Sequence, residues 1–102
     1  MLEITEDDVR EALHDVIDPE LGINVVDLGL VYQISVEDGR RIHVLMTMTT
    51  PGCPATNYIQ GGAERRLMLI PGAEDVEVRL AWAPPWSPDM MSAEARHQLG
   101  MD

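Results

Sequence analysis

Apolar residues near the N-terminus recur at the spacing of one helical face. The members of this run are Val9, Ala12, Leu13, Val16 and Ile17. Thr5 precedes the run, and Asp8 follows Thr5 at the spacing of a capping box, with Asp in the usual place of Glu. We expect this helix to end at Asp18, because the next residue is Pro19 and proline disfavours helical backbone in the residue before it.

Two later segments alternate apolar residues with others, as half-buried strands do. The apolar positions are Leu30, Tyr32, Ile34 and Val36 in the first segment and Ile42, Val44, Met46 and Met48 in the second. Glu37, Asp38 and Gly39 lie between the segments and favour a tight turn, so the pattern predicts a β-hairpin. A third alternating segment, from Val76 to Trp82, predicts another strand.

Helical spacing returns between the hairpin and the third strand. The positions are Ile59, Ala63, Leu67 and Ile70. They predict a second helix that starts beside Cys53, with Pro54 in its first turn. Proline suits that position, because the N–H group that it lacks would have no hydrogen-bond partner there. Gly61 and Gly62 lie inside this helix and each costs about 1 kcal/mol relative to Ala. We therefore expect this helix to be the least stable element.

The C-terminal part predicts one more short helix. Ser92 is suited to cap it, and Gly100 to stop it. The resulting order, αββαβα, implies an α/β (α+β) two-layer sandwich in which helices cover a small mixed three-stranded sheet. We expect a single domain over residues 1–102, because a chain of 102 residues has too little surface to bury a second core. The two tryptophans are expected to pack as core (Trp82) and lid (Trp86).

The charge of the chain narrows its partners. It has 18 Asp and Glu against 7 Lys and Arg, a net charge of −11, which repels nucleic-acid phosphates and anionic lipid headgroups. We expect no nucleic acid and no membrane as partner. The N-terminus carries acids where a secretory signal carries basic residues, and a single cysteine forms no internal disulfide. Both facts predict a cytoplasmic protein.

Cys53 is the residue with the most evident chemistry. It lies in the predicted turn from strand to helix, where free backbone N–H groups and the helix dipole favour a thiolate. A thiolate is both a nucleophile and a soft metal ligand. A lone cysteine is equally common as an inert buried residue, and its position alone does not decide between these roles.

Carboxylates and hydroxyls accompany Cys53 in the predicted loops. Asp18, Glu20 and Asp27 lie in turns, where carboxylates orient a thiol, ligate iron or simply bond to backbone. Asp27 is the stronger functional candidate, because its neighbours are apolar and a buried acid needs a partner. The hydroxyls of Thr49 and Thr50 are placed either to reach the thiol or to cap the helix.

Four ordered segments carry a resemblance to a known family. They are Asp18-Pro19-Glu20-Leu21-Gly22, Asn24-Val25-Val26-Asp27-Leu28-Gly29-Leu30-Val31-Tyr32, Thr47-Met48-Thr49-Thr50-Pro51-Gly52-Cys53-Pro54 and Trp82-Ala83-Pro84-Pro85-Trp86-Ser87-Pro88-Asp89-Met90-Met91-Ser92. The chain resembles the family of SufT, PaaD and the eukaryotic cytosolic iron–sulfur targeting protein that partners MMS-nineteen. The resemblance implies a fold similar to iron–sulfur cluster assembly domains. It also implies a functional cluster of Asp18, Glu20, Leu21, Asp27, Thr49, Thr50 and Cys53.

By the same resemblance, the chain is an accessory factor that carries or targets clusters to client proteins, rather than an enzyme. The partners implied are the iron–sulfur assembly machinery and client apoproteins. Cys53 is implied as a transient ligand of an iron–sulfur cluster, with no tightly bound cofactor. One thiolate does not complete the usual set of four ligands, so a homodimer with two Cys53, or a client, has to supply the rest.

Three alternatives remain open at this point. The domain could act as an adaptor that docks a carrier to a client without binding a cluster. It could be a thiol-dependent enzyme with Cys53 as nucleophile, although no base or oxyanion site is identifiable. It could also serve as a PaaD-like subunit that supports a phenylacetate-type ring oxygenase, although the cysteine-bearing tail typical of PaaD is absent after Asp102.

Overall fold

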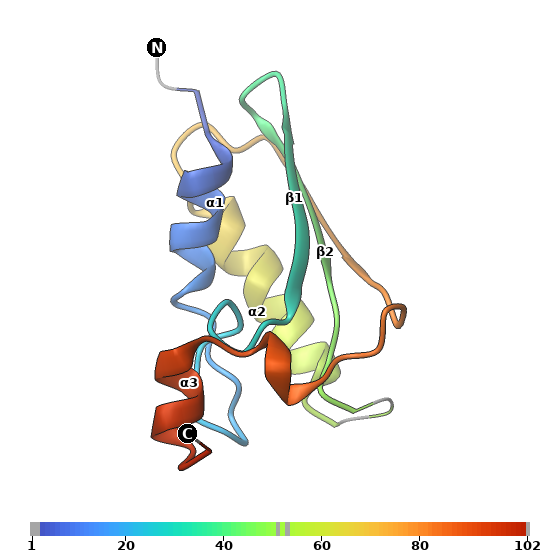
Figure 1. The fold of residues 1–102 in the computed structure, drawn as a ribbon. Coiled ribbons are helices and arrows are strands. Elements are labelled where there is room, and N and C mark those ends of the chain that lie inside the picture. Colours follow the sequence, from blue (N-terminus) through green and yellow to red (C-terminus); the bar gives the residue numbers. More distant parts are fainter. Residues whose placement is uncertain (1–2, 51, 53, 102) are drawn as a thin grey trace.

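The computed structural model describes residues 3–50, 52 and 54–101. The elements are α1 (Glu6–Leu13), β1 (Val31–Glu37), β2 (Arg41–Met46), α2 (Thr56–Met68), β3 (Asp75–Leu80), the 3₁₀ turn η1 (Pro88–Met90) and α3 (Ala93–Gln98). Helices α1 and α2 run in opposite directions along one face of the sheet, and α3 lies at the far end from the N-terminus (Figure 1). The predicted order of elements is confirmed.

The sheet has the order β1-β2-β3, with β2 in the centre. Strands β1 and β2 are antiparallel and form the predicted hairpin, whereas β2 and β3 are parallel and are joined through α2. The sheet is therefore mixed, as expected. This topology places the C-terminal end of β2 and the N-terminal end of α2 at the same end of the molecule (Figure 1).

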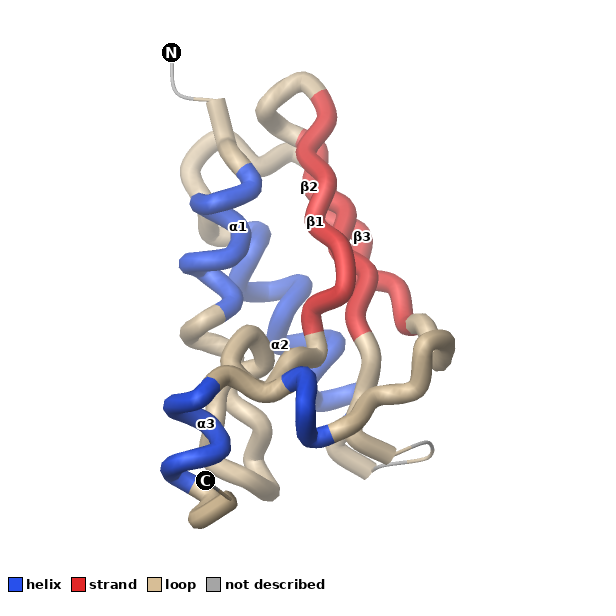
Figure 2. Tube along the Cα trace, viewed as in Figure 1, coloured by secondary structure: helices blue, strands red, loops and turns tan. Residues whose placement is uncertain are grey.

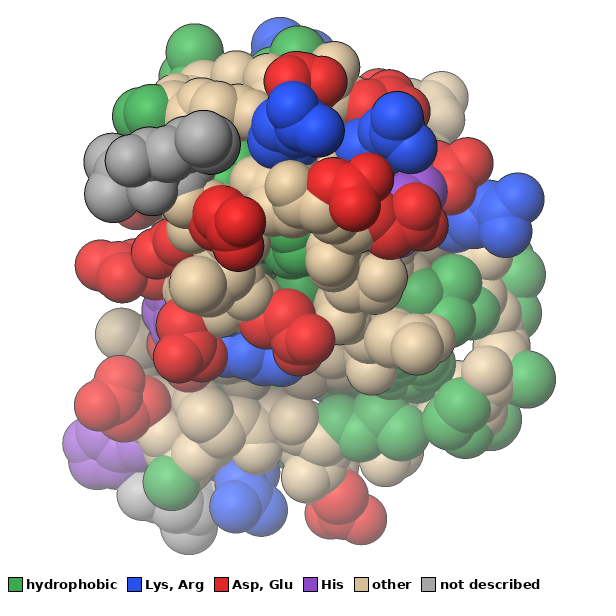
Figure 3. All heavy atoms as spheres, turned by 90° about the horizontal axis from the view of Figure 1, so that it is seen from above, with side chains coloured by type: hydrophobic (Ala, Val, Ile, Leu, Met, Phe, Trp, Pro, Cys, Tyr) green, Lys and Arg blue, Asp and Glu red, His purple; other side chains and the backbone are tan. Residues whose placement is uncertain are grey.

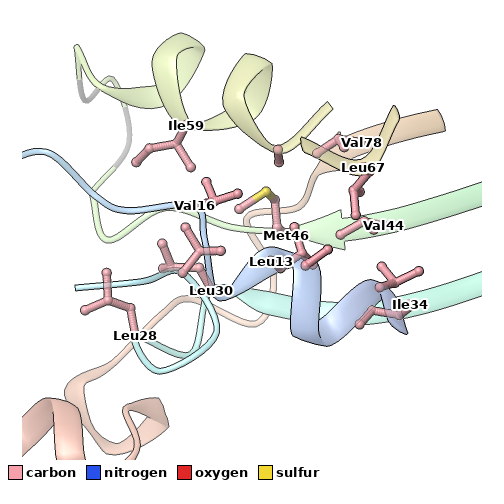
Figure 4. Packing of buried hydrophobic residues seen from close by; sticks show 14 of the residues in the cluster. Leu13, Val16, Leu28, Leu30, Ile34, Val44, Met46, Ile59, Leu67 and Val78 are labelled. Carbon is pink, nitrogen blue, oxygen red and sulfur yellow. The ribbon is translucent and has the colours of Figure 1, made fainter. Parts of the chain in front are cut away.

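The core lies between the sheet and the two helices α1 and α2 (Figure 4). Alternate strand residues face the helices, as the period-two pattern predicted. Helix α1 adds its apolar face, and α2 adds one residue per turn. The residues that carry this packing are Leu13, Val16, Leu28, Leu30, Ile34, Val44, Met46, Ile59, Leu67 and Val78.

Capping explains where α1 and α3 begin. The Thr5 hydroxyl accepts the Asp8 N–H at 3.1 Å, and the Asp8 carboxylate accepts the Thr5 N–H at 3.0 Å, so the predicted capping box is present. Ser92 accepts the Ala95 N–H at 3.1 Å and caps α3, as predicted. Both helices therefore start at residues that the sequence identifies.

Helix α2 differs from its prediction at the start. It begins at Thr56 with Ala55 as N-cap, so Pro54 lies before the helix and not in its first turn. The helix nevertheless continues through Gly61 and Gly62 without a break. The Gln60 amide donates to the Val78 carbonyl of β3 at 2.8 Å and fixes α2 to the sheet, a contact that local propensity does not include.

The third strand also ends earlier than predicted. It stops at Leu80, and Trp82 is 45% exposed rather than part of the core. The chain leaves the sheet there because it turns back toward the segment that precedes β1. Trp86 is half-buried and donates its indole N–H to the Leu28 carbonyl at 2.7 Å, which confirms its role as a lid.

Among residues 3–50, 52 and 54–101, no helix is long and apolar enough to cross a membrane.

Candidate functional site

Most of the long loops lie at the end of the molecule opposite the β1–β2 turn (Figure 2). Two hydrogen bonds tie them to one another. The Thr47 N–H, just after β2, donates to the Leu30 carbonyl at 2.8 Å. The Ser92 N–H, just before α3, donates to the Asp27 carbonyl at 2.8 Å. Segments far apart in the sequence therefore form one connected region around the entry to β1 and the exit from β2.

Asp18 has a structural role in this region. Its side chain is buried, at 4% exposure. One carboxylate oxygen accepts the N–H groups of Glu20 at 2.8 Å and Leu21 at 3.3 Å, and the Asp18 carbonyl accepts the Gly22 N–H at 2.8 Å. Asp18 therefore builds a turn that follows α1 rather than ending it. The helix was predicted to end at Asp18, but it already ends at Leu13 with His14 as its C-cap, because the chain leaves helical backbone there and Ile17 pairs with Asn24 instead. The contact of Asp18 with backbone was the structural alternative in the sequence.

The turn that Asp18 builds presents its neighbours outward. Glu20 is exposed, and Leu21 is 38% exposed. The predicted site residues thus separate into one that shapes the turn and two that face solvent. The exposed side chain of Leu21 adds apolar surface at this turn.

Asp27 closes the second turn of the region. Its carboxylate accepts the Asn24 amide at 2.8 Å, and its own N–H donates to the Asn24 side-chain oxygen at 2.9 Å. The acid is half-buried between apolar neighbours, and Asn24 is the partner that its position required. Because its carbonyl also holds Ser92, Asp27 joins this turn to the C-terminal segment.

The segment from β2 to α2 carries the remaining predicted residues. Thr49 is half-buried and Thr50 is exposed. No described side chain caps the first turn of α2, and that turn carries no acid, so the capping role considered for Thr50 is absent from the described residues. The exposed N–H groups of an uncapped helix attract negative charge. Cys53, the centre of the predicted site and its predicted metal ligand, lies outside the described residues.

Two threonines at the ends of this segment were not predicted. Within the described part of the chain, the buried hydroxyls of Thr47 and Thr56 have no hydrogen-bond partner. Thr47 is only 1% exposed, whereas strand alternation beside Met46 predicted that it faces outward. The alternation does not extend to Thr47 because β2 ends at Met46. The sequence feature that could have indicated these two residues is that they lie on either side of Cys53.

Apolar side chains are exposed where α1 leads into this region. Ile17 is 44% exposed and Tyr58, in the first turn of α2, is 62% exposed. The two line one small cavity of about 220 Å³ together with Gly62 and Arg65. Because Tyr58 lies in the turn that follows the cysteine segment, this surface adjoins the candidate site.

The described residues do not form a metal site by themselves. Among them, no group of three or more His, Cys, Asp or Glu side chains is arranged to hold a metal ion. The carboxylates of Asp18 and Asp27 are engaged in turns. These contacts therefore favour a structural role for both acids over the iron ligation that the sequence left open.

A model of the family described as iron–sulfur cluster assembly protein matches residues 6–80. The chain belongs to this family. The match runs from α1 through β3 and thus contains the Asp18 and Asp27 turns and the segment between β2 and α2. The family resemblance seen in the sequence is confirmed.

Similar proteins cover nearly all of the chain. It is 48% identical over 86 residues to the Fe-S protein maturation auxiliary factor SufT of Staphylococcus aureus, covering 84% of this chain and 98% of that protein. It is 39% identical to the Fe-S protein maturation auxiliary factor YitW of Bacillus subtilis, covering 99% of each. A crystal structure of a DUF59 domain from Bacillus anthracis superposes with a TM-score of 0.90 at 38% identity, covering 95% of this chain and 92% of that one.

These comparisons confirm the fold and an accessory function in iron–sulfur protein maturation. The relatives are named as auxiliary factors, in agreement with the predicted accessory role. The residues that perform this function are a separate question, which the geometry of the loops addresses.

Proposed function

We propose that this chain serves iron–sulfur protein maturation through Cys53, with the loops around Asp18 and Asp27 as its framework. The observation that supports this most is the uncapped first turn of α2. Cys53 precedes Thr56 by three residues. Backbone N–H groups at a helix start favour a thiolate nearby, and a thiolate is the form that binds cluster iron.

Each predicted side chain has a stated part in this proposal. Asp18 and Asp27 hold the two turns in shape through backbone and amide contacts. Glu20 and Leu21 belong to the surface that meets a partner. Thr49 and Thr50 lead into the cysteine turn, where their hydroxyls bond to the thiolate, the cargo or the client.

The cluster is cargo in this proposal rather than a resident cofactor. A single Cys53 supplies one of the four ligands that a cluster usually needs. The remaining ligands come from a client apoprotein, from a small thiol or from Cys53 of a second copy. The incomplete set favours transient binding, because a cluster held by few ligands from this chain is readily passed on.

Anaerobic reconstitution with iron and sulfide tests whether Cys53 binds a cluster. The wild type, Cys53→Ser and the control Glu94→Gln on α3 are compared by visible absorption and by iron per chain. We expect absorption from a cluster in the wild type and the control, and its loss in Cys53→Ser. If none of the three proteins binds iron and sulfide, the carrier role is excluded, and the adaptor and the thiol-dependent enzyme are the roles that remain.

The activity of a client enzyme distinguishes an adaptor from a domain without function in cluster delivery. An apo-form iron–sulfur enzyme is mixed with reduced scaffold-borne cluster, with and without this chain, and its activity is followed over time. An adaptor accelerates the gain of activity although it binds no cluster alone. An equal rate with and without the chain would contradict both versions of the proposal.

A further inference from the structure

A second surface lies along α1, away from the cysteine segment. It is a groove of about 620 Å³ between α1 and the C-terminal part of α2. Its apolar side is formed by Leu69, Ile70 and Pro71, and its other side by the exposed face of α1. Leu69 is 73% exposed, and the adjacent Met68 is 49% exposed. Large aliphatic side chains this exposed mark a surface that is suited to a partner.

The wall of the groove is strongly acidic. Its carboxylates are Glu3, Asp8, Glu11 and Asp15, and its arginine is Arg66. Arg66 already pairs with Asp15 at 3.0 Å. Neither Glu3 nor Glu11 forms an ion pair with a described residue. The wall therefore keeps an excess of negative charge beside an exposed aliphatic ridge.

The acids of α1 are also spaced as one row. Asp8 and Glu11 are three residues apart and share a face of α1, and Asp15 follows two residues after the helix ends. Like charges at this spacing repel one another by about 0.2–0.5 kcal/mol per pair. A partner with positive charges at matching intervals would remove this repulsion. The face seen from above carries many acidic side chains, and arginine side chains lie among them at several places (Figure 3).

These features select one kind of occupant. Anionic lipids, nucleic acid and acidic proteins are repelled by the wall. A second copy would bring the same acidic row against itself, which is unfavourable in a symmetric contact. We infer that the groove binds a basic amphipathic helix of a partner protein, whose Lys or Arg residues meet the α1 row and whose aliphatic anchor packs on Leu69.

The location of the groove makes it independent of the cysteine segment. Thr56 and Leu69 lie at opposite ends of α2, which corresponds to about 20 Å at 1.5 Å per residue. A partner held at the groove leaves the first turn of α2 accessible. The groove is thus suited to keep a partner attached while the other end of the molecule acts.

The test uses a synthetic peptide as probe, a helix former with Leu on one face and Lys on both sides of it. It is titrated into the ¹⁵N-labelled full chain, and amide shifts report affinity and location. We expect shifts concentrated in residues 3–15 and 66–71. A peptide with Glu in place of each Lys should show no binding, and added salt should weaken the binding of the Lys peptide.

Two variants separate this site from general attraction to an acidic protein. Leu69→Asn removes the anchor contact without changing charge, and Glu11→Gln removes one acid of the row. Each should weaken binding by about threefold to tenfold, and both together by about tenfold or more. The control Glu94→Gln removes an acid on α3 and should leave the affinity unchanged. Since these side chains are exposed, the variants are expected to fold.

Several results would overturn the inference. Equal affinity of Leu69→Asn and wild type, or shifts spread evenly over acidic surfaces, would mean that the peptide binds by charge alone. No binding of the Lys peptide would exclude this class of partner. A dimer in sedimentation that becomes monomeric in Leu69→Asn would show that the groove joins two copies instead. None of these results bears on cluster binding through Cys53, which is measured separately.

Discussion

At the scale of single residues, the two central acids of the predicted site are engaged within their own turns. Asp18 is buried and accepts two backbone N–H groups, and Asp27 exchanges two hydrogen bonds with Asn24. Buried acceptors of this kind hold a loop in one conformation. These residues therefore fix the two turns in which they lie.

Replacing Asp18 should test this structural role. In Asp18→Ala the N–H groups of Glu20 and Leu21 lose their acceptor, so we expect the free energy of unfolding to fall by about 1–3 kcal/mol. Asp18→Asn keeps a side-chain oxygen in the same place and should lose less. Urea unfolding measures both. Equal stability of Asp18→Ala and the wild type would contradict the role.

Gly29 offers a second test at this scale. It has a φ of +78°, and an added Cβ would overlap the backbone carbonyl of Met90. Gly22 has a similar φ of +70° with open space around it. Gly22→Ala should therefore lose about 1–2 kcal/mol from the left-handed backbone alone, and Gly29→Ala clearly more. If Gly22→Ala and Gly29→Ala lose similar amounts of unfolding free energy in urea, the segment around Met90 moves away from the added Cβ at little cost.

At the scale of elements, helix α2 contains two glycines for which the structure shows little need. Gly62 has helical backbone, and a Cβ there would lie 3.9 Å from Val16 Cγ1, an ordinary contact. Gly62→Ala should raise the free energy of unfolding by about 0.5–1 kcal/mol, because Ala loses less backbone entropy. Thermal and urea unfolding measure the gain. A loss of stability would indicate that the helix interior is more crowded than described.

Periodicity predicted the helices and strands because burial of one face dominates their sequences. It predicted their ends less well. Pro54 suits a first helical turn, yet α2 begins at Thr56, and Trp82 fits strand alternation, yet β3 ends at Leu80. In both cases the end of the element is set by where the chain must go next. Local spacing contains no information about that path.

The candidate site was predictable in its residue types but not in their roles. The turn sequence around Asp18 indicated an acid in a loop, and the structure shows that the acid is buried and bonded to backbone. Thr47 was missed because its burial depends on the Leu30 loop folding over the end of β2. Such contacts join residues distant in sequence, and no local pattern records them.

At the scale of the whole molecule, the net charge of −11 opposes folding through self-repulsion. Raising the ionic strength from about 0.01 M to about 0.15 M shortens the Debye length from about 30 Å to about 8 Å. We expect the unfolding temperature at neutral pH to rise over this range. The ionic strength is set with sodium chloride, and the unfolding temperature is measured by calorimetry. A constant or falling temperature would mean that local ion pairs outweigh the net charge.

The central claim is that maturation of iron–sulfur proteins by this chain depends on Cys53. The most direct measurement is the activity of an iron–sulfur enzyme in cells that lack the gene and are supplied with wild type, Cys53→Ser or Glu94→Gln at equal protein level. The account predicts restored activity with wild type and Glu94→Gln, and little or none with Cys53→Ser. Full restoration by Cys53→Ser would contradict the account.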